Sequence, residues 1–206
     1  MGISERRKRE KELMRKLILR ASMELFVKEG FHNVSIRHIA ERIEYSPATI
    51  YLYFKNKDEI IYKLNEEGFR ELNKRMLRTS SVKDPLERIR KIGEVYIHFG
   101  LENQEYYELM FITKATMKNL EEPECGWDCG EEAFMTLQNT VQDCIDSGII
   151  DSQNVVATTI GLWATVHGFV SLIIRERLEI LPDEHKQAIL NQAQNFILDL
   201  IQRIRK

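Results

Sequence analysis

An interruption in the apolar pattern of residues 35–61 restricts the fold more than any other feature of the sequence. Apolar side chains recur at helical spacing over residues 36–43, which predicts a short helix with one apolar face. The period stops at Glu44 and restarts at Ser46, whose hydroxyl can accept from the free N–H groups of a helix start. Pro47 suits the first position of that second helix, because its missing N–H has no helical partner there. Two short helices joined by a tight turn follow from this spacing.

The second helix is expected over residues 48–54, with Ile50 and Phe54 turned inward. Asn56 can cap a third helix, and Glu59 lies three residues further on, as in a capping box. Helix, turn and second helix form the helix-turn-helix pattern, in which the second helix enters the major groove of DNA. The stretch is therefore interpreted as a reader of double-stranded DNA.

Individual residues in and before this motif also match a known family. The matching residues are Ala21, Leu25, Phe26, Gly30, Phe31, Ser35, Ile39, Ala40, Ser46, Thr49, Ile50, Tyr51, Tyr53, Phe54 and Lys57. With them, the run Ile18–Ile61 resembles the N-terminal DNA-binding domain of the tetracycline repressor (TetR) family. The resemblance implies a dimer that forms through the last two helices of the chain.

Charge is distributed unevenly along the sequence. Residues 1–60 carry a net charge of +4 and residues 61–206 a net charge of −6, which suits a DNA-reading head on an acidic body. Eight Lys and Arg residues between positions 6 and 20 are consistent with a solvated helix or with an arm on phosphates or the minor groove. Strand-like alternation does not stand out anywhere. We predict an all-α protein with a DNA-binding domain at 1–60, a connecting helix at 57–78 and a regulatory and dimerisation domain at 79–206.

Reading DNA needs hydrogen-bonding or apolar groups on the second motif helix and phosphate anchors around it. Thr49, Tyr51 and Tyr53 offer hydroxyls, and Arg37 could bind guanine O6 and N7 in a bidentate manner. Lys57 would add charge to the N–H groups at the start of the third helix, a good phosphate site. The predicted DNA-binding residues are Ser35, Arg37, Ser46, Pro47, Ala48, Thr49, Tyr51, Leu52, Tyr53 and Lys57.

Some of these residues have a structural alternative. Tyr51 and Tyr53 are equally consistent with packing inside the domain, and Ser35 is a helix cap first and a phosphate contact second. Glu44 departs from the family, which commonly has Gly at this turn because the chain there needs positive φ. Either the turn differs here, or a strain of about 1 kcal/mol is tolerated.

Residues 155–174 contain no Lys, Arg, Asp or Glu, and their length would span a bilayer. Polar side chains spread along the segment and no basic cluster flanks it, so we favour a helix inside protein over a membrane helix. Small residues within it step by four and three and share one face, which lets a second helix approach closely. Together with the apolar last helix, they predict a four-helix interface in a homodimer. The predicted interface residues are Ala157, Gly161, Ala164, Gly168, Ser171, Ile189, Ala193, Phe196 and Leu200.

The body is expected to bind a small-molecule effector that the sequence does not identify. Aromatic residues at helical spacing are more often core than ligand site, so the candidates form a pool from which a pocket could draw. The acidic body mildly favours a cationic or neutral ligand. The candidate pocket residues are Tyr96, His98, Phe99, Tyr107, Phe111, Trp127, Phe134, Trp163 and His167.

The cysteines offer an alternative form of regulation. Cys125 and Cys129 lack the further Cys or His neighbours of a four-ligand zinc site, so no metal or other cofactor is expected. A redox-responsive regulator that uses this pair is the alternative to a ligand-responsive one. The odd number of cysteines and the charged N-terminal segment favour a reduced, cytoplasmic setting.

Our hypothesis is a cytoplasmic, ligand-responsive transcriptional repressor that binds a palindromic operator as a homodimer. An enzyme would need a convergent set such as Ser/His/Asp or a glycine-rich phosphate loop, and the sequence shows no local signature of either. A helical membrane-associated or scaffold protein built on residues 155–174 is the alternative from a different class.

Overall fold

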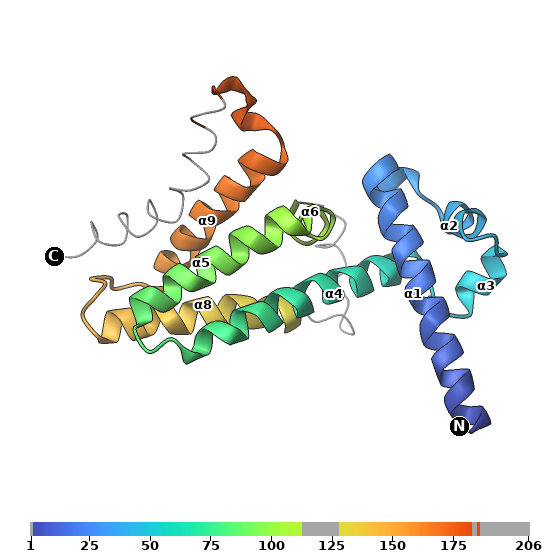
Figure 1. Ribbon diagram of the computed structural model, residues 1–206, viewed down its shortest axis with the longest axis horizontal. Helices are drawn as coiled ribbons and strands as arrows, with labels where there is room; N and C mark the ends of the chain where they lie inside the picture. Colours follow the sequence, from blue (N-terminus) through green and yellow to red (C-terminus); the bar gives the residue numbers. More distant parts are fainter. Residues whose placement is uncertain (1, 113–127, 183–184, 186–206) are drawn as a thin grey trace. The chain divides into compact units, whose positions relative to one another are not determined.

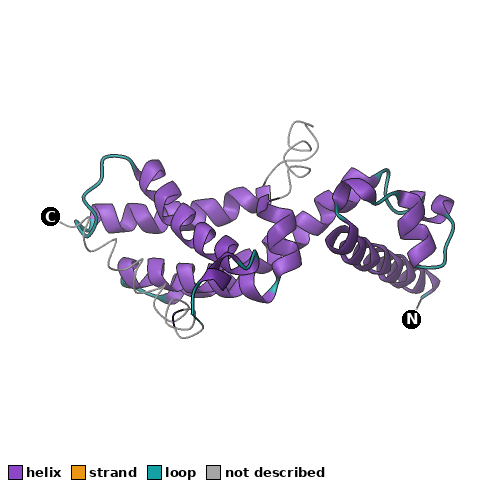
Figure 2. Cartoon of the chain, turned by 90° about the horizontal axis from the view of Figure 1, so that it is seen from above, coloured by secondary structure: helices purple, strands orange, loops and turns teal. Residues whose placement is uncertain are grey.

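The computed structural model describes residues 2–112, 128–182 and 185, and the regular structure of these residues is entirely helical (Figures 1 and 2). This confirms the predicted all-α fold. In chain order the elements are α1 (Ile3–Glu29), the short 3-10 helix η1 (Phe31–Asn33), α2 (Ile36–Arg42), α3 (Pro47–Tyr51), α4 (Lys57–Leu77), η2 (Arg78–Ser81), α5 (Pro85–Glu102), α6 (Gln104–Tyr107), the π-helix η3 (Glu108–Ile112), α8 (Asp128–Asp146), α9 (Val155–Ile174) and η5 (Arg177–Ile180).

The chain forms two compact units. The first contains residues 1–68 and 105–126, and the second contains residues 69–104 and 127–206. Helix α4 therefore contributes its first half to one unit and its second half to the other. The bounds of these units differ from those of the two predicted functional domains, residues 1–60 and 79–206. The functional domains stay a prediction.

The first unit is built on one hydrophobic cluster that α1, α2, α3 and α4 share. Ile18, Ile39, Ile50 and Phe54 are each at most 1% exposed within it. Helix α3 is shorter than the predicted span of 48–54, because the N–H groups of Tyr53 and Phe54 both donate to the Ile50 carbonyl (2.9 and 3.0 Å) and the chain then leaves the helix. The inward positions of Ile50 and Phe54 are confirmed.

The turn between α2 and α3 is a Schellman motif that holds Glu44 at φ 61°, in the left-handed region. The Tyr45 N–H donates to the Ala40 carbonyl (2.9 Å), and the Glu44 N–H donates to the Glu41 carbonyl (3.2 Å). These two bonds satisfy carbonyls that the end of α2 would otherwise leave unpaired. The turn thus keeps the positive φ that is usual for glycine, and Glu44 tolerates the strain.

Residues 105–112 pack into the first unit although they follow helix α5 in the chain. Leu109 belongs to the same buried cluster as Ile18, and Tyr106 packs against that cluster. Gly68 makes this approach possible, because a Cβ atom at this position would lie only 2.9 Å from Cδ1 of Tyr106. The Tyr106 hydroxyl donates to Glu67 Oε2 (3.2 Å), and burial raises the pKa of Tyr106 to about 12.

In the second unit α5, α8 and α9 pack against one another. Helix α5 begins where Asp84 accepts from the N–H groups of Leu86 and Glu87 (2.8 and 3.1 Å), with Pro85 in its first turn. The Asn73 side-chain amide of α4 donates to the Cys129 carbonyl (2.9 Å) and so connects α4 with α8.

Helix α9 is the one helix in the described residues whose length and composition would suffice to cross a membrane, with a mean hydropathy of 1.6. It buries Thr159, Leu162, Val166 and Val170 against the second unit. The opposite side of the helix is exposed. In a single chain, the predicted burial of this helix inside protein is therefore seen for one of its faces.

Candidate nucleic-acid interface

Helix α3 presents a mixed polar and apolar face to solvent while its other face packs into the core. Tyr51 and Leu52 are 56% and 76% exposed, and Pro47 and Ala48 are exposed beside them. Among the described residues of the first unit, Leu52 is the most exposed large apolar side chain, and only a second surface placed against it would bury it. For Tyr51, the structure favours the reader position over packing inside the domain.

Two serines cap the motif helices and thereby set their directions. The Ser35 hydroxyl accepts from the His38 N–H (3.2 Å) at the start of α2. The Ser46 hydroxyl accepts from the Thr49 N–H (3.2 Å) at the start of α3 and lies 3.0 Å from the Thr49 hydroxyl. Thr49 is half-buried, so its hydroxyl can contact a base or a phosphate only beside this existing interaction.

The guanidinium of Arg37 extends from α2 into solvent. Its side chain is 79% exposed, and Nε donates to Glu41 Oε1 one turn along the helix (3.0 Å). Ion pairs of this exposed kind contribute about 0.3–0.5 kcal/mol. DNA therefore competes with a weak interaction, and Arg37 is available to bind a guanine edge.

Tyr53 lies behind α3 rather than on its reading face. Its side chain is half-buried against the hydrophobic cluster of the first unit. The Tyr53 carbonyl accepts from Nη1 of Arg15 (2.5 Å), and the Arg15 guanidinium lies 4.3 Å from the centre of the Phe54 ring. Arg15 thus fixes the end of α3 to α1. Sequence reasoning gave it only a place in the basic run, although its spacing from Ile18 puts both residues on one helix face.

The Lys57 side chain makes contacts within the head that its predicted place as a phosphate anchor did not include. Its Nζ donates to the carbonyls of Phe31 and Val34 (2.9 and 2.8 Å) and lies 4.1 Å from the centre of the Phe31 ring. Burial lowers the pKa of Lys57. The ammonium holds the start of α4 against the 31–34 segment, and its contact with a phosphate stays a prediction. The predicted cap is present, since Asn56 Oδ1 accepts from the Glu59 N–H (2.8 Å).

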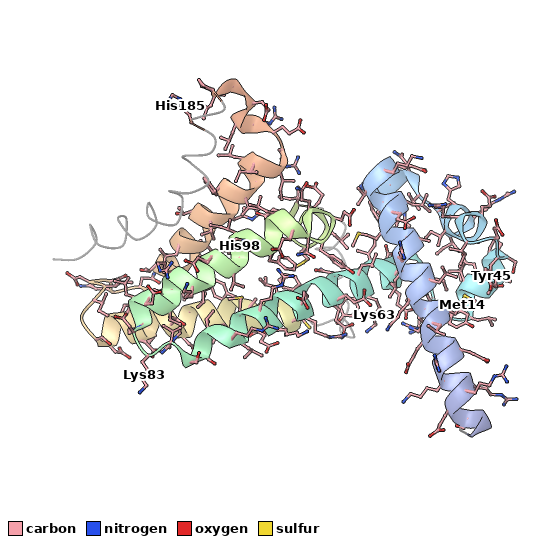
Figure 3. All side chains as sticks on the ribbon, viewed as in Figure 1. Met14, Tyr45, Lys63, Lys83, His98 and His185 are labelled. Atoms are coloured by element: carbon pink, nitrogen blue, oxygen red, sulfur yellow. The ribbon has the colours of Figure 1, made fainter. Side chains whose placement is uncertain are left out.

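Tyr45 is an exposed aromatic residue at the rim of the motif that the sequence reasoning did not select as a reader. It follows Glu44 in the turn between α2 and α3 and is 45% exposed (Figure 3). The signal that could have found it is its place directly before the cap Ser46, at the entrance to the reading helix.

Four of the predicted effector residues come together in the second unit, on helices α5, α8 and α9. Nε1–H of Trp163 donates to the Tyr96 hydroxyl (3.1 Å), which lies 3.2 Å from Nδ1 of His167. The Phe134 ring meets the Trp163 ring edge-on at 6.4 Å between centroids. Burial lowers the pKa of His167, which favours the neutral imidazole, and a neutral Nδ1 can accept from the Tyr96 hydroxyl. We call these four residues the Tyr96 cluster.

The other predicted effector residues are not part of this cluster. His98 is exposed and lines an open hollow of about 490 Å³ together with Arg75, Arg78 and Lys91. Helical spacing explains the separation, because His98 lies two residues after Tyr96 and so on another side of α5. The remaining residues lie in the core (Phe99), in the first unit with their rings 5.1 Å apart (Tyr107, Phe111), or outside the described residues (Trp127).

Two of the three cysteines are described, and Cys144 is a free thiol. Cys129 is half-buried and Cys144 is buried, with a pKa that burial raises to about 11. Cys125 lies outside the described residues, as does the geometry of the proposed redox pair. Among the described residues, no group of three or more His, Cys, Asp or Glu side chains could hold a metal ion.

The small residues of α9 lie on its exposed side. Ala157, Gly161 and Ala164 are exposed, and Gly168 and Ser171 are half-buried. A Cβ atom added at Gly161 or Gly168 would have no described neighbour within 4 Å. The other predicted interface residues lie outside the described residues: Ile189, Ala193, Phe196 and Leu200.

Two family models match the chain. Residues 18–63 match the model of bacterial regulatory proteins of the tetR family. Residues 89–193, about half of the chain, match the model of the tetracyclin repressor-like C-terminal domain. The second match extends the family relationship beyond the helix-turn-helix, which is the only part of the sequence that the motif residues covered.

Comparison with individual proteins gives the same relationship. The chain is 23% identical over 167 residues to the uncharacterized HTH-type transcriptional regulator YobS of Bacillus subtilis, across 81% of this chain and 82% of YobS. It is 36% identical over 59 residues to the fatty acid metabolism regulator protein of the same species, across 29% and 30% of the two chains. The solved structure of the TetR family regulator PfmR from Thermus thermophilus has a TM-score of 0.64 at 19% identity and covers 90% of this chain and 97% of PfmR.

The head with its exposed reading helix and the all-helical body agree with both family models. The chain belongs to the tetR family of bacterial regulatory proteins, which are DNA-binding transcriptional regulators.

Proposed function

We propose that the protein is a homodimeric repressor that binds a palindromic operator and leaves it when a small molecule binds to the body. The observation that carries the proposal is the exposed apolar face of α9, because a second copy of the chain on this face would pair two heads. Residues 79–206 would then serve as the regulatory and dimerisation domain.

The α9 face has the features of a helix-pairing surface. Ile160 is 48% exposed, and Val156 and Leu172 flank it with comparable exposure. Gly161 and Ala164 lie between them and leave room for another helix backbone. A soluble protein rarely leaves a row of such residues in water. Two-fold symmetry satisfies the face with its own copy, since the same patch then serves both subunits.

Pairing determines how DNA is read. Two copies of α3 held about 34 Å apart, or a multiple of it, would enter successive major grooves of a palindrome. Tyr51, Leu52, Pro47 and Ala48 would contact base edges and thymine methyl groups. Arg37 would bind a guanine. The caps at Ser35 and Ser46 would orient both helices against the phosphates.

Release from DNA is proposed to follow from a population shift. An effector that binds better to the conformation whose heads are wrongly spaced lowers the fraction able to bind the operator. We propose the Tyr96 cluster as the effector site, because it combines aromatic rings with a hydrogen-bonded hydroxyl and imidazole at the junction of three helices of the second unit. A bound molecule there would contact α5, α8 and α9 at once.

The test of the dimer compares two substitutions of the same kind. Ile160→Arg puts a charge on the α9 face, and Leu77→Arg puts one on another exposed aliphatic position, at the end of α4. Sedimentation velocity should give a dimer for the unmodified protein and for Leu77→Arg, and a monomer for Ile160→Arg. Affinity for a duplex selected by the unmodified protein from a random pool should fall only in the monomeric variant. An unmodified protein that is monomeric while bound to that duplex would contradict the proposal.

The test of the effector site uses displacement from the same duplex. Compounds that release the unmodified protein should lose potency on Tyr96→Phe, which removes the hydroxyl and keeps the ring. His98→Gln, on the hollow outside the cluster, is the matched control and should respond normally. Equal potency on Tyr96→Phe and on the unmodified protein would place the effector elsewhere.

A further inference from the structure

Helix α1 extends well beyond the head that it helps to form. From residue 4 onward its first buried residue is Ile18, and residues 4–13 are exposed on every side of the helix. In Figure 1 these N-terminal turns run past α2 and α3 and leave the packed part of the first unit. Apolar burial therefore does not explain this part of α1, which holds five Lys and Arg residues between positions 4 and 13.

The cations on this extension are not spread evenly around the helix. Ile18, Ser22 and Phe26 mark the buried face of α1, and steps of three and four residues continue that face back to Arg15 and Lys11. One further turn brings it to Lys8 and Arg7. At about 100° per residue, these four cations lie within about 60° of the centre of the buried face. The same stripe is thus apolar inside the head and cationic outside it.

The acidic residues of the extension lie away from this stripe. Glu5, Glu10 and Glu12 are about 80–120° from its centre on the same helical count. Glu10 accepts from Arg6 on the side of the helix (2.8 Å). The stripe that continues the buried face therefore carries positive charge with no carboxylate on it.

Arg15 shows where the stripe points. Its guanidinium reaches the Tyr53 carbonyl directly behind α3 and lies against the Phe54 ring. Lys11 and Arg7 follow on the same side, about 6 and 12 Å further along the axis at a rise of 1.5 Å per residue. The stripe thus leads from the end of the reading helix outward over a length that corresponds to about two to four base pairs of DNA.

We propose that Arg7, Lys8 and Lys11 form a second DNA contact, which binds backbone phosphates that flank the bases read by α3. The inference rests on the proposed operator binding and adds a rigid helical arm to it. Its occupant is DNA because the cationic stripe is continuous with the reading helix through Arg15 and complementary to a phosphate backbone. Arg and Lys contacts to phosphates position a protein without reading sequence. Loss of the arm should therefore weaken binding to all duplexes and leave the preference among them unchanged.

The experiment compares two full-length triple variants with the same change of net charge. The arm variant carries Arg7→Gln, Lys8→Gln and Lys11→Gln. The control carries Arg9→Gln, Lys16→Gln and Arg20→Gln, which are exposed on the opposite side of α1. Circular dichroism should show equal helicity and thermal unfolding for both, because all six residues are exposed. Fluorescence anisotropy between 50 and 200 mM salt then measures affinity for a duplex that the unmodified protein selects from a random pool, and for a duplex of scrambled sequence.

The plot of log K against log salt has a negative slope, and each lost phosphate contact makes it less steep by about 0.9. The slope of the arm variant should therefore be less steep by up to about 2.7. Its affinity in 0.1 M salt should fall by roughly 10²-fold on both duplexes, while the control variant stays within a few-fold of the unmodified protein. Hydroxyl-radical footprints of the arm variant should lose protection only outside the segment covered by α3. Equal slopes and footprints for the two variants would overturn the arm. An unmodified protein that selects no duplex would overturn the operator function itself.

Discussion

Replacing Glu44 by Gly should stabilise the DNA-binding head by about 1 kcal/mol, because the turn between α2 and α3 holds this residue at φ 61°. A side chain in the left-handed region costs about 1–2 kcal/mol. Glycine removes this strain but gives the unfolded chain more freedom, which offsets about 0.4–1 kcal/mol. Glu44 is exposed, so its side chain takes little packing with it when it is removed. The two effects leave a gain between about 0 and 1.6 kcal/mol.

Glu44→Ala is the variant that isolates the backbone contribution. It removes the carboxylate, which lies unfavourably at the C-terminal end of α2, and keeps the Cβ atom that causes the strain. Urea unfolding followed by circular dichroism should therefore rank the free energy of unfolding as Glu44→Gly above Glu44→Ala, with Ala close to the unmodified protein. If Ala gains as much as Gly, the charge and not the backbone explains the effect, and the strain argument is refuted. Duplex affinity should stay constant, because Gly keeps the same turn.

Three further predictions follow from the described side chains. Arg37→Ala should lose about 1–3 kcal/mol of binding on the selected duplex and relax one base position, as measured by anisotropy on single-base variants of that duplex; unchanged specificity would remove Arg37 from the readers. Burial lowers the pKa of His167 below 6.5, so the unfolded state takes up the extra proton at a higher pH than the folded state does. The free energy of unfolding should therefore fall as the pH drops from 7 through 6.5. His167→Gln should lose this part of the pH dependence, as measured by urea titrations at pH 7 and pH 5. Burial raises the pKa of the Cys144 thiol to about 11, so Ellman's reagent at pH 8 should label it only after unfolding, and peptide mapping that finds it labelled in the native protein would contradict its placement.

Local chemistry in the sequence was enough to predict where the helices of the DNA-binding motif begin. Ser35, Ser46 and Asn56 each cap a helix as expected, because a cap needs only its own hydroxyl or amide and an N–H three residues later. Pro47 lies in the first turn of α3 for the same local reason. The burial of Ile50 also follows from spacing alone. These features depend on neighbours within one helical turn.

Features that depend on distant parts of the chain could not be predicted in this way. The bonds from Lys57 to the carbonyls of Phe31 and Val34 reach residues 26 and 23 positions earlier in the chain, and nothing beside Lys57 in the sequence indicates them. Arg15 gains its role from Tyr53, 38 residues away. The candidate effector residues separate into several places for the same reason. Composition identified them as aromatic, but only the packing of α5, α8 and α9 brings four of them together.

The packing of residues 105–112 beside Gly68 has a consequence for how such regulators can be recombined. A gene fusion that takes the head as residues 1–68 would leave behind Leu109, which fills the cluster around Ile18. Chimeras that join this head to a foreign body should therefore fold well only when the graft also carries the residues 105–112 or a matching partner for Gly68. Exchange of heads between paralogues during evolution faces the same restriction, because the exchangeable piece is not one continuous stretch of the gene.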